Sequence, residues 1–171
     1  VVNIVSVGRL AKQKAFENSV LAAKALQDRG FAFNWYIIGE GTERSRLEQL
    51  IQANQLQDSF FLLGFRDNPY PYIKAADIYV QSSSFEGLGR TIIEASILCK
   101  PIVTTNFPTA YSILRPNETG IITEMDAQSI AKGILQLIDQ PELKEKIIHN
   151  LQNQVDNGKE LTLRQVYELF G

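Results

Sequence analysis

The chain has 171 residues, of which 44% are hydrophobic and 21% charged, and 17 Lys and Arg against 19 Asp and Glu give a net charge of −2. This composition is typical of a globular protein, and the length suits one domain with one sizeable core. The slightly acidic balance argues against binding nucleic acid by general charge attraction, and no apolar run reaches the roughly 18 residues of a membrane span.

Two single counts limit the chemistry. One cysteine, Cys99, excludes an internal disulfide and a metal site built from several cysteines. One histidine, His149, leaves no histidine cluster for zinc and disfavours a Ser-His-Asp triad. We expect Cys99 to be a packing residue and His149 to lie on the surface of a late helix. Chemistry in this chain must therefore come from carboxylates, backbone amides, arginine and lysine.

Short apolar runs, rich in Val, Ile, Phe and Tyr, alternate along the chain with longer amphipathic stretches. Several of these runs lack polar alternation, which is typical of strands buried on both faces of a parallel sheet. Six runs are predicted as strands: Val1–Val7, Phe33–Ile38, Phe60–Gly64, Asp77–Gln81, Pro101–Thr105 and Gly120–Thr123.

Between the strands, apolar residues recur every three or four positions, which is the spacing of helices. The first helix carries its apolar side chains from Phe16 to Leu26 and is expected to end near Gly30. A later helix begins near Asp126 and is stopped by Pro141. Further helices are predicted around Leu47–Ile51, Tyr72–Ala76, Ile92–Leu98 and Ala110–Leu114, and over 142–155 and 162–170.

This alternation predicts a doubly wound α/β domain with a six-stranded parallel sheet and right-handed crossovers. Ligands of such sheets bind beyond the carboxyl ends of the strands, where helix N-termini point their amides outward. The functional residues are therefore expected in the loops that follow strands. Because Val1 already belongs to the first strand and is not an initiator Met, we expect the chain to be a piece of a longer protein.

The loop after the first strand is basic. Gly8 lets the chain leave the strand tightly, and Arg9 and Lys14 flank the loop. The two cations can converge on one anion, because arginine offers a planar fork to phosphate oxygens and lysine adds a compact charge. The helix that starts near Ala15 adds its positive end. The alternative is a solvated basic loop without a ligand.

The loop after the second strand is a glycine-rich turn, Gly39–Thr42, with Thr42 as the predicted N-cap of the next helix. It either approaches a ligand closely or is an ordinary turn. The chain contains neither the G-x-G-x-x-G fingerprint nor a G-x-x-x-x-G-K-[ST] motif. These absences argue against a dinucleotide-dependent dehydrogenase and against a P-loop protein.

The loop after the fourth strand carries the most specific pattern. Glu86 and Glu94 are separated by seven residues, and Gly87 and Gly89 follow directly behind the first of them. The glycines free two backbone amides for close approach to a ligand. Glu94 falls in the early turns of the next helix, so it can point back toward the strand ends.

A carboxylate at the position of Glu94 can accept two hydroxyl hydrogens from a ribose diol. The helix amides near Arg90 and Thr91 can take phosphate. The alternative is a pair of solvated glutamates at a helix start, where acidic residues are favoured in any case. That alternative does not explain the paired glycines.

Four stretches in order resemble the group 1 glycosyltransferases, which are retaining, nucleotide-sugar-dependent enzymes of the GT-B fold. They are Ser6–Leu10 with Lys14, Ile38–Gly41, Phe61–Phe65 and the pair Glu86 and Glu94, whose E-x7-E spacing is the signature of that family. The resemblance covers residues 1 to about 145. It implies that 1–171 is the donor-binding second domain, the C-terminal half of a GT-B fold, without the acceptor-binding N-terminal domain.

The resemblance implies roles on the sugar side of the site. Glu86 would be the catalytic residue, in contact with the transferred sugar near its reacting carbon. Gly87, Leu88 and Gly89 would supply amides to the sugar, and Glu94 would hold the ribose.

On the diphosphate side, the resemblance implies that Arg9, Lys14, Arg90 and Thr91 hold the donor phosphates. Positive charge and the helix dipole would stabilise the leaving diphosphate, with no bound metal and no cofactor beyond the donor. The residues that would border the nucleobase are Gly39, Gly41, Phe65 and Arg66.

The family further implies a UDP-sugar as the donor and a glycan or a lipid-linked molecule as the acceptor, held by the missing domain. No nucleic-acid partner is expected. We expect a cytoplasmic location, with the full-length protein at the inner membrane face in some members, and no transfer activity in the isolated chain.

The sequence departs from the family pattern in four places. Ala15 and Cys99 stand where the family usually has glycine, and Leu88 stands where it usually has phenylalanine. Asn106–Thr109 replaces a glycine-rich acidic turn. The departures at Cys99 and at 106–109 affect the sugar-side contacts and the identity of the sugar.

Two alternative functions stay open. One is a nucleotide-sugar epimerase of similar fold, which the single histidine disfavours. The other is a non-catalytic binding domain, which the presence of Arg9, Lys14 and Glu94 disfavours.

Overall fold

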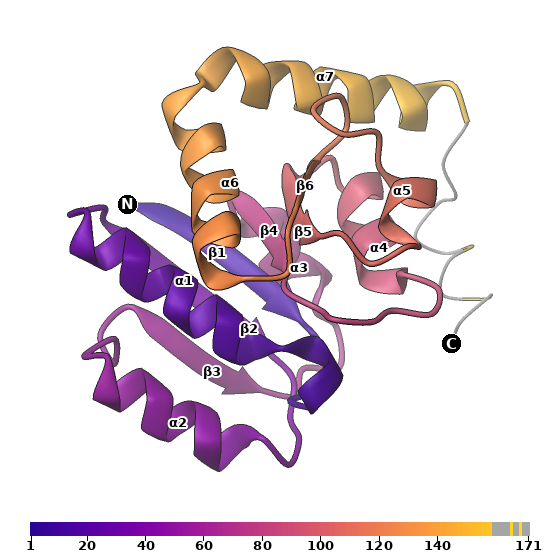
Figure 1. The fold of residues 1–171 in the computed structure, drawn as a ribbon. Coiled ribbons are helices and arrows are strands. Elements are labelled where there is room, and N and C mark those ends of the chain that lie inside the picture. Colours follow the sequence, from indigo (N-terminus) through magenta and orange to yellow (C-terminus); the bar gives the residue numbers. More distant parts are fainter. Residues whose placement is uncertain (159–164, 166–167, 169–171) are drawn as a thin grey trace.

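Six parallel strands form one sheet in the computed structural model, which describes residues 1–158, 165 and 168 (Figure 1). Their order across the sheet is β3-β2-β1-β4-β5-β6. The predicted six-stranded parallel sheet is confirmed, and every strand lies within one residue of its expected bounds. The strands are β1 (Val2–Val7), β2 (Phe33–Ile38), β3 (Phe60–Gly64), β4 (Ile78–Gln81), β5 (Ile102–Thr105) and β6 (Ile121–Thr123).

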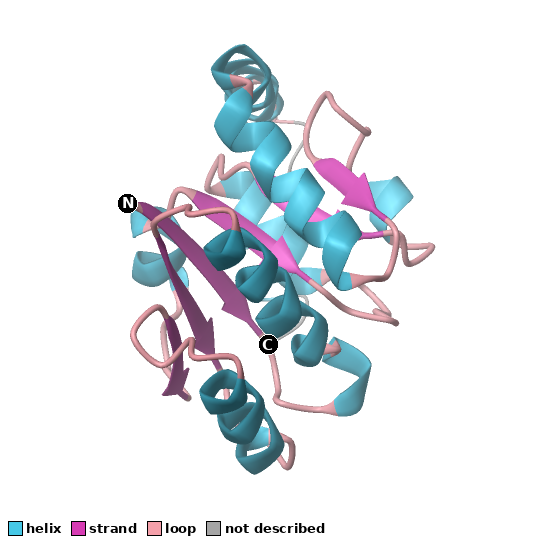
Figure 2. Ribbon diagram, turned by 60° about the vertical axis from the view of Figure 1, so that its left-hand side comes forward, coloured by secondary structure: helices cyan, strands magenta, loops and turns pink. Residues whose placement is uncertain are grey.

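Helices cover both faces of the sheet (Figure 2). One face is covered by α1 (Phe16–Asp28), α2 (Arg44–Ala53) and α6 (Ala127–Asp139), and the other by α3 (Tyr70–Ala75), α4 (Arg90–Ile97) and α5 (Ala110–Ile113). A short 3-10 helix, η1 (Lys12–Lys14), precedes α1, and α7 (Pro141–Asp156) follows α6. The helix predicted over 162–170 falls, except for 165 and 168, outside the described residues.

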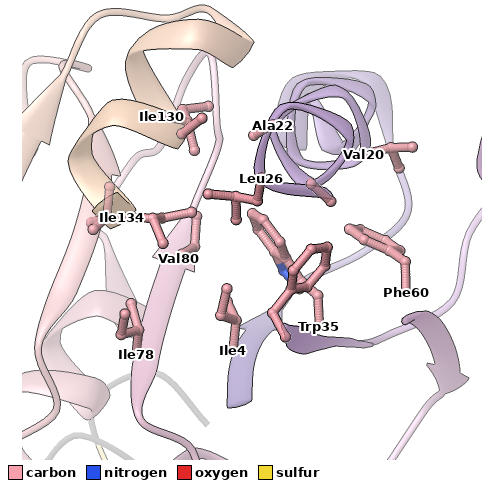
Figure 3. Packing of buried hydrophobic residues seen from close by; sticks show 14 of the residues in the cluster. Ile4, Val20, Ala22, Leu26, Trp35, Phe60, Ile78, Val80, Ile130 and Ile134 are labelled. Atoms are coloured by element: carbon pink, nitrogen blue, oxygen red, sulfur yellow. The ribbon is translucent and has the colours of Figure 1, made fainter. Parts of the chain in front are cut away.

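Consecutive strand residues pack into different layers of the core. Ile4 of β1 packs against α1 and its neighbours, whereas Val5 packs in the cluster on the other face of the sheet. Figure 3 shows Leu26 of α1 over Trp35, which is fully buried, and Ile134 of α6 beside Val80 of β4. Burial on both faces explains why the strand sequences lack polar alternation.

The helix starts match the sequence signals only in part. Helix α6 begins next to Asp126, as predicted, and the Asp126 carboxylate caps it by accepting a hydrogen bond from the Ser129 backbone N–H at 2.8 Å. That bond lowers the pKa of the Asp126 carboxyl. The prediction that Thr42 caps α2 is wrong, because the N-cap is Glu43. The Glu43 N–H donates to Leu10 O at 2.9 Å, so the turn continues to this residue.

At two positions where the sequence departs from the family pattern, the backbone adopts the conformation that favours glycine. Ala15 has a φ of +50° and Cys99 a φ of +58°, so both lie in the left-handed region. That conformation costs an L-residue roughly 1–2 kcal/mol and costs glycine little. The positions where the family usually has glycine therefore keep the glycine backbone in this chain.

The strand order reverses at β1, which has β2 on one side and β4 on the other. The loops that follow β1 and β4 consequently meet at the carboxyl edge of the sheet. The Ser84 N–H donates to Gln13 O at 2.9 Å, and Ser82 Oγ donates to Lys14 O at 2.8 Å. Such a reversal is where ligands of open α/β sheets bind.

Candidate functional site

A cleft of about 890 Å³ lies at this carboxyl edge, between the loops after β1, β2 and β3 and the start of α4. Seven of the residues predicted for the site line it: Arg9, Gly39, Phe65, Arg66, Arg90, Thr91 and Glu94. Its remaining lining residues are Val7, Gly8, Ile38, Glu40, Asp67, Asn68, Pro69 and Tyr70. The other predicted residues, which lie outside the lining, are Lys14, Gly41, Glu86, Gly87, Leu88 and Gly89.

Glu94 is a buried carboxylate on the wall of the cleft, with only 2% of the residue exposed. Its Oε1 accepts hydrogen bonds from Arg90 Nε at 2.7 Å and from the Tyr70 hydroxyl at 3.2 Å. The bond to Glu94 raises the pKa of the Arg90 guanidinium, and burial raises the pKa of the Tyr70 phenol. Arg90 therefore holds Glu94 in place, which leaves the backbone amide of Arg90 as its predicted contact with phosphate.

Glu86 belongs to a second cluster. Its Oε1 accepts hydrogen bonds from Lys14 Nζ at 2.5 Å, Gln81 Nε2 at 2.7 Å and Ser83 Oγ at 2.7 Å. The side chains of Lys14 and Glu86 are only 13% and 11% exposed. Lys14 thus pairs with Glu86, and its side chain does not line the cleft that Arg9 lines.

Arg9 is an exposed cation on the cleft. Among the described residues, its side chain has no hydrogen bond or ion pair. Arg66, on the same cleft, is held by its neighbours, since its Nε donates to the Tyr72 hydroxyl at 3.1 Å and its guanidinium lies 5.9 Å from the Tyr72 ring centre. Arg9 is thus the cation that an anionic ligand can engage without breaking an existing contact.

The glycines of the Glu86 loop differ in what they do. Gly89, the N-cap of α4, has a φ of +69°, and a Cβ there would lie 2.4 Å from Ile113 Cδ1. Gly87 has open space around it, so its backbone is accessible to a ligand. Leu88 between them is exposed. Thr109 Oγ1 donates to Glu86 O at 2.8 Å, which ties the unusual 106–109 segment to this loop.

Three polar residues that shape the site were not predicted from the sequence: Tyr70, Gln81 and Ser83. Thr109 lies in the 106–109 segment, which was expected to affect the sugar-side contacts. Tyr70 is the first residue of the short helix α3 and lies between two prolines, where no motif distinguishes it. Gln81 and Ser83 carried a usable signal, because they end an apolar strand with a run of polar residues directly before Glu86. His149 is exposed on α7 and Cys99 is half-buried against the core, as predicted.

Over residues 1–158, 165 and 168, no group of three or more His, Cys, Asp or Glu side chains could hold a metal ion. Within the same residues, no helix combines the length and the apolar character needed to cross a bilayer.

A family model described as Glycosyl transferases group 1 matches residues 2–154. The alpha-D-kanosaminyltransferase of Streptomyces kanamyceticus is 30% identical over 150 residues, covering 86% of this chain and 39% of that enzyme. The chain is thus similar to about two fifths of that relative.

Two solved structures are similar in fold. One is the C-terminal domain of the group 1 glycosyl transferase family protein LpcC from Francisella tularensis, with a TM-score of 0.83 and 26% identity over 94% of this chain and 87% of that one. The other is HepE of Anabaena in complex with UDP, with a TM-score of 0.81 and 21% identity over 98% of this chain and 46% of that one. These likenesses confirm the predicted fold class, the C-terminal half of a GT-B fold.

Proposed function

This chain belongs to the group 1 glycosyl transferases, and we propose that it is the domain that binds the nucleotide-sugar donor of a retaining glycosyltransferase. One observation carries the proposal. A buried carboxylate, Glu94, and an exposed guanidinium, Arg9, border the same cleft as the first turn of α4. A ribose diol needs an acceptor such as the carboxylate, and a diphosphate needs cations and helix amides.

The same chemistries support a position for each part of the donor. Its ribose binds Glu94, and its diphosphate lies between Arg9 and the amides of Arg90 and Thr91. Its base occupies the side of the cleft bordered by Phe65 and by the residues Gly39 and Arg66. Its sugar reaches Glu86 and the amides of the 87–89 loop, with Lys14 near the junction of sugar and phosphate.

We propose UDP as the nucleotide, supported by the UDP that HepE, a protein of the same fold, binds in its crystal structure. The acceptor is a glycan or a lipid-linked molecule held by a second domain. Transfer needs donor and acceptor aligned together, a contribution of about 7–11 kcal/mol in favourable cases. The isolated chain is therefore proposed to bind the donor without transferring its sugar. We propose that the whole enzyme works in the cytoplasm, and that it works at the membrane face if its acceptor is lipid-linked.

The direct test is calorimetric titration of the chain with UDP, GDP, ADP and uridine. We expect UDP to bind more tightly than uridine, because uridine lacks the phosphates that Arg9 and α4 would hold. A thermal shift that grows with UDP concentration is the second expected sign, since a ligand that binds only the folded state raises its stability. Absence of binding by all three diphosphates would overturn the proposal, and tighter binding of GDP or ADP would correct the base.

Replacing Arg9 with Ala is expected to weaken UDP binding by about tenfold, because an exposed charge-assisted hydrogen bond contributes about 1.5 kcal/mol. Uridine affinity should not change. Arg46→Ala is the matched control, since Arg46 is an exposed arginine of α2 that does not line the cleft. Equal UDP affinities for Arg9→Ala and Arg46→Ala would remove Arg9 from the phosphate site.

A further inference from the structure

A buried amide connects the Glu86 cluster to the cleft. Gln81 is the last residue of β4 and is 2% exposed. Its Nε2 donates to Glu86 Oε1 at 2.7 Å and to Ser83 Oγ at 2.8 Å. Its Oε1 accepts from the Tyr79 hydroxyl at 2.8 Å and from Thr91 Oγ1 at 3.3 Å. Both ends of the amide are thus bound by partners from β4, the Glu86 loop and α4.

Only one of the two amide orientations satisfies these partners. An ionised carboxylate accepts hydrogen bonds and donates none, so the amide nitrogen must face Glu86. The amide oxygen then faces Tyr79 and Thr91, which donate to it. Burial raises the pKa of the Tyr79 phenol, so Tyr79 keeps the proton that it donates. A flipped amide would oppose its oxygen to the carboxylate oxygen at 2.7 Å and lose the hydrogen bond to Glu86.

We propose that Gln81 is a positioning residue, which holds the Glu86 carboxylate so that Oε2 is presented to the sugar of the donor. The inference rests on the proposed function, because it takes Glu86 as the residue that contacts the sugar. Three donors, from Lys14, Gln81 and Ser83, saturate Oε1. Among the described residues, no hydrogen bond reaches Oε2.

Gln81 differs from the other two donors in rigidity. The Ser83 hydroxyl can rotate, and the Lys14 ammonium sits on a flexible four-carbon stem. The Gln81 amide is planar, buried and bound at both ends, so it fixes the direction from which Oε1 is approached. Thr91 lines the cleft and bonds to the same amide. Gln81 therefore links the carboxylate to the side chain of Thr91 in the first turn of α4.

The test compares the affinities of the chain for UDP and for UDP-glucose, UDP-galactose, UDP-N-acetylglucosamine and UDP-N-acetylgalactosamine. The variant is Gln81→Met, which keeps the length of the side chain and removes the amide. We expect its UDP affinity to stay within about twofold of that of the unaltered chain. The discrimination, which is the ratio of the highest to the lowest affinity among the four UDP-sugars, should fall by about tenfold, the effect of losing one charge-assisted contact. A loss of packing alone would weaken UDP and the UDP-sugars together.

The matched control is Thr104→Val, which alters a buried polar residue whose Oγ1 bonds to Gln81 O at 3.3 Å and leaves the amide in place. It should retain the sugar discrimination. Tyr79→Phe is a milder second variant, because it keeps the ring in the core and removes one of the hydroxyls that orient the amide. We expect it to lose discrimination about two- to fivefold, so the test survives if Gln81→Met does not fold.

Each result has one meaning. Failure of the unaltered chain to bind UDP overturns the proposed function. UDP binding without any discrimination among the UDP-sugars, or discrimination that Gln81→Met and Tyr79→Phe both retain, overturns the positioning role alone. Equal losses for UDP and for UDP-sugars also overturn it, because they show that Gln81 supports the fold of the site instead.

Discussion

Replacing Glu94 with Gln is expected to lower the affinity of the chain for UDP about a hundredfold, or about 2.7 kcal/mol. The carboxylate is buried on the cleft wall, held by Arg90 Nε at 2.7 Å and by the Tyr70 hydroxyl. A hydrogen bond to a charged group contributes about 1.5–3 kcal/mol, and a ribose diol supplies two hydroxyl donors. Glutamine keeps the shape and can still accept from Arg90, so the fold should persist while the charge is lost. Calorimetric titration measures the effect.

Glu86→Gln makes the same chemical change at the other end of the pair. Because Glu86 lies outside the cleft lining and is proposed to face the sugar, this variant should bind UDP like the unaltered chain. Glu118→Gln, on an exposed glutamate that pairs with Arg115, controls for the loss of one negative charge. Equal losses of UDP affinity at Glu86 and Glu94 would contradict the division of roles between the two glutamates.

The strands were predictable because burial on both faces leaves a strong pattern. Runs such as Phe60–Gly64 contain almost nothing but apolar residues and begin and end where the structure has β3. The order of the strands across the sheet was not predictable, because the sequence of one strand does not determine which other strand pairs with it. It follows from long-range pairing, such as that of β1 with β4 through Ile4 and Ile78.

The loops that form the site could be predicted from the sequence, but the contacts between their side chains could not. Parallel strands place their carboxyl ends at one edge, so the loop with Arg9 and the loop that leads into the helix of Glu94 had to lie at that edge. Charge alone suggested that Arg9 and Lys14 serve one anion, and the resemblance gave both to the diphosphate. The structure pairs Lys14 with Glu86, at a distance that depends on the β1–β4 pairing. Tyr70 was missed because a single polar residue among prolines carries no motif, whereas the polar run that begins at Gln81 was a usable signal.

Replacing Gly39 with Ala is expected to lower the free energy of unfolding by about 3–5 kcal/mol. Its φ is +151°, and a Cβ there would lie 1.9 Å from Gly8 O, a backbone atom. Neither segment can move away cheaply. The Gly8 N–H donates to Ile38 O at 3.0 Å, the Gly39 N–H to Gly64 O at 2.9 Å and the Leu10 N–H to Glu40 O at 2.9 Å. The glycine is therefore explained by the packing of the two loops that form the cleft.

Two other glycine variants, measured by urea or thermal unfolding, distinguish backbone strain from the steric clash as the cause of that loss. Gly30 has a φ of +81° and open space around it, so Gly30→Ala carries backbone strain alone and should cost roughly 1–2 kcal/mol. Gly87 has neither a positive φ nor a neighbour within 4 Å, so Gly87→Ala should change stability by less than about 0.5 kcal/mol. If Gly39→Ala lowered the free energy of unfolding no more than Gly30→Ala, the loops after β1 and β2 would be able to move apart without a cost in stability. The cleft between them would then not be a fixed feature of the fold, and the rigid placement of Arg9 on the cleft that Glu94 also lines would lose its basis.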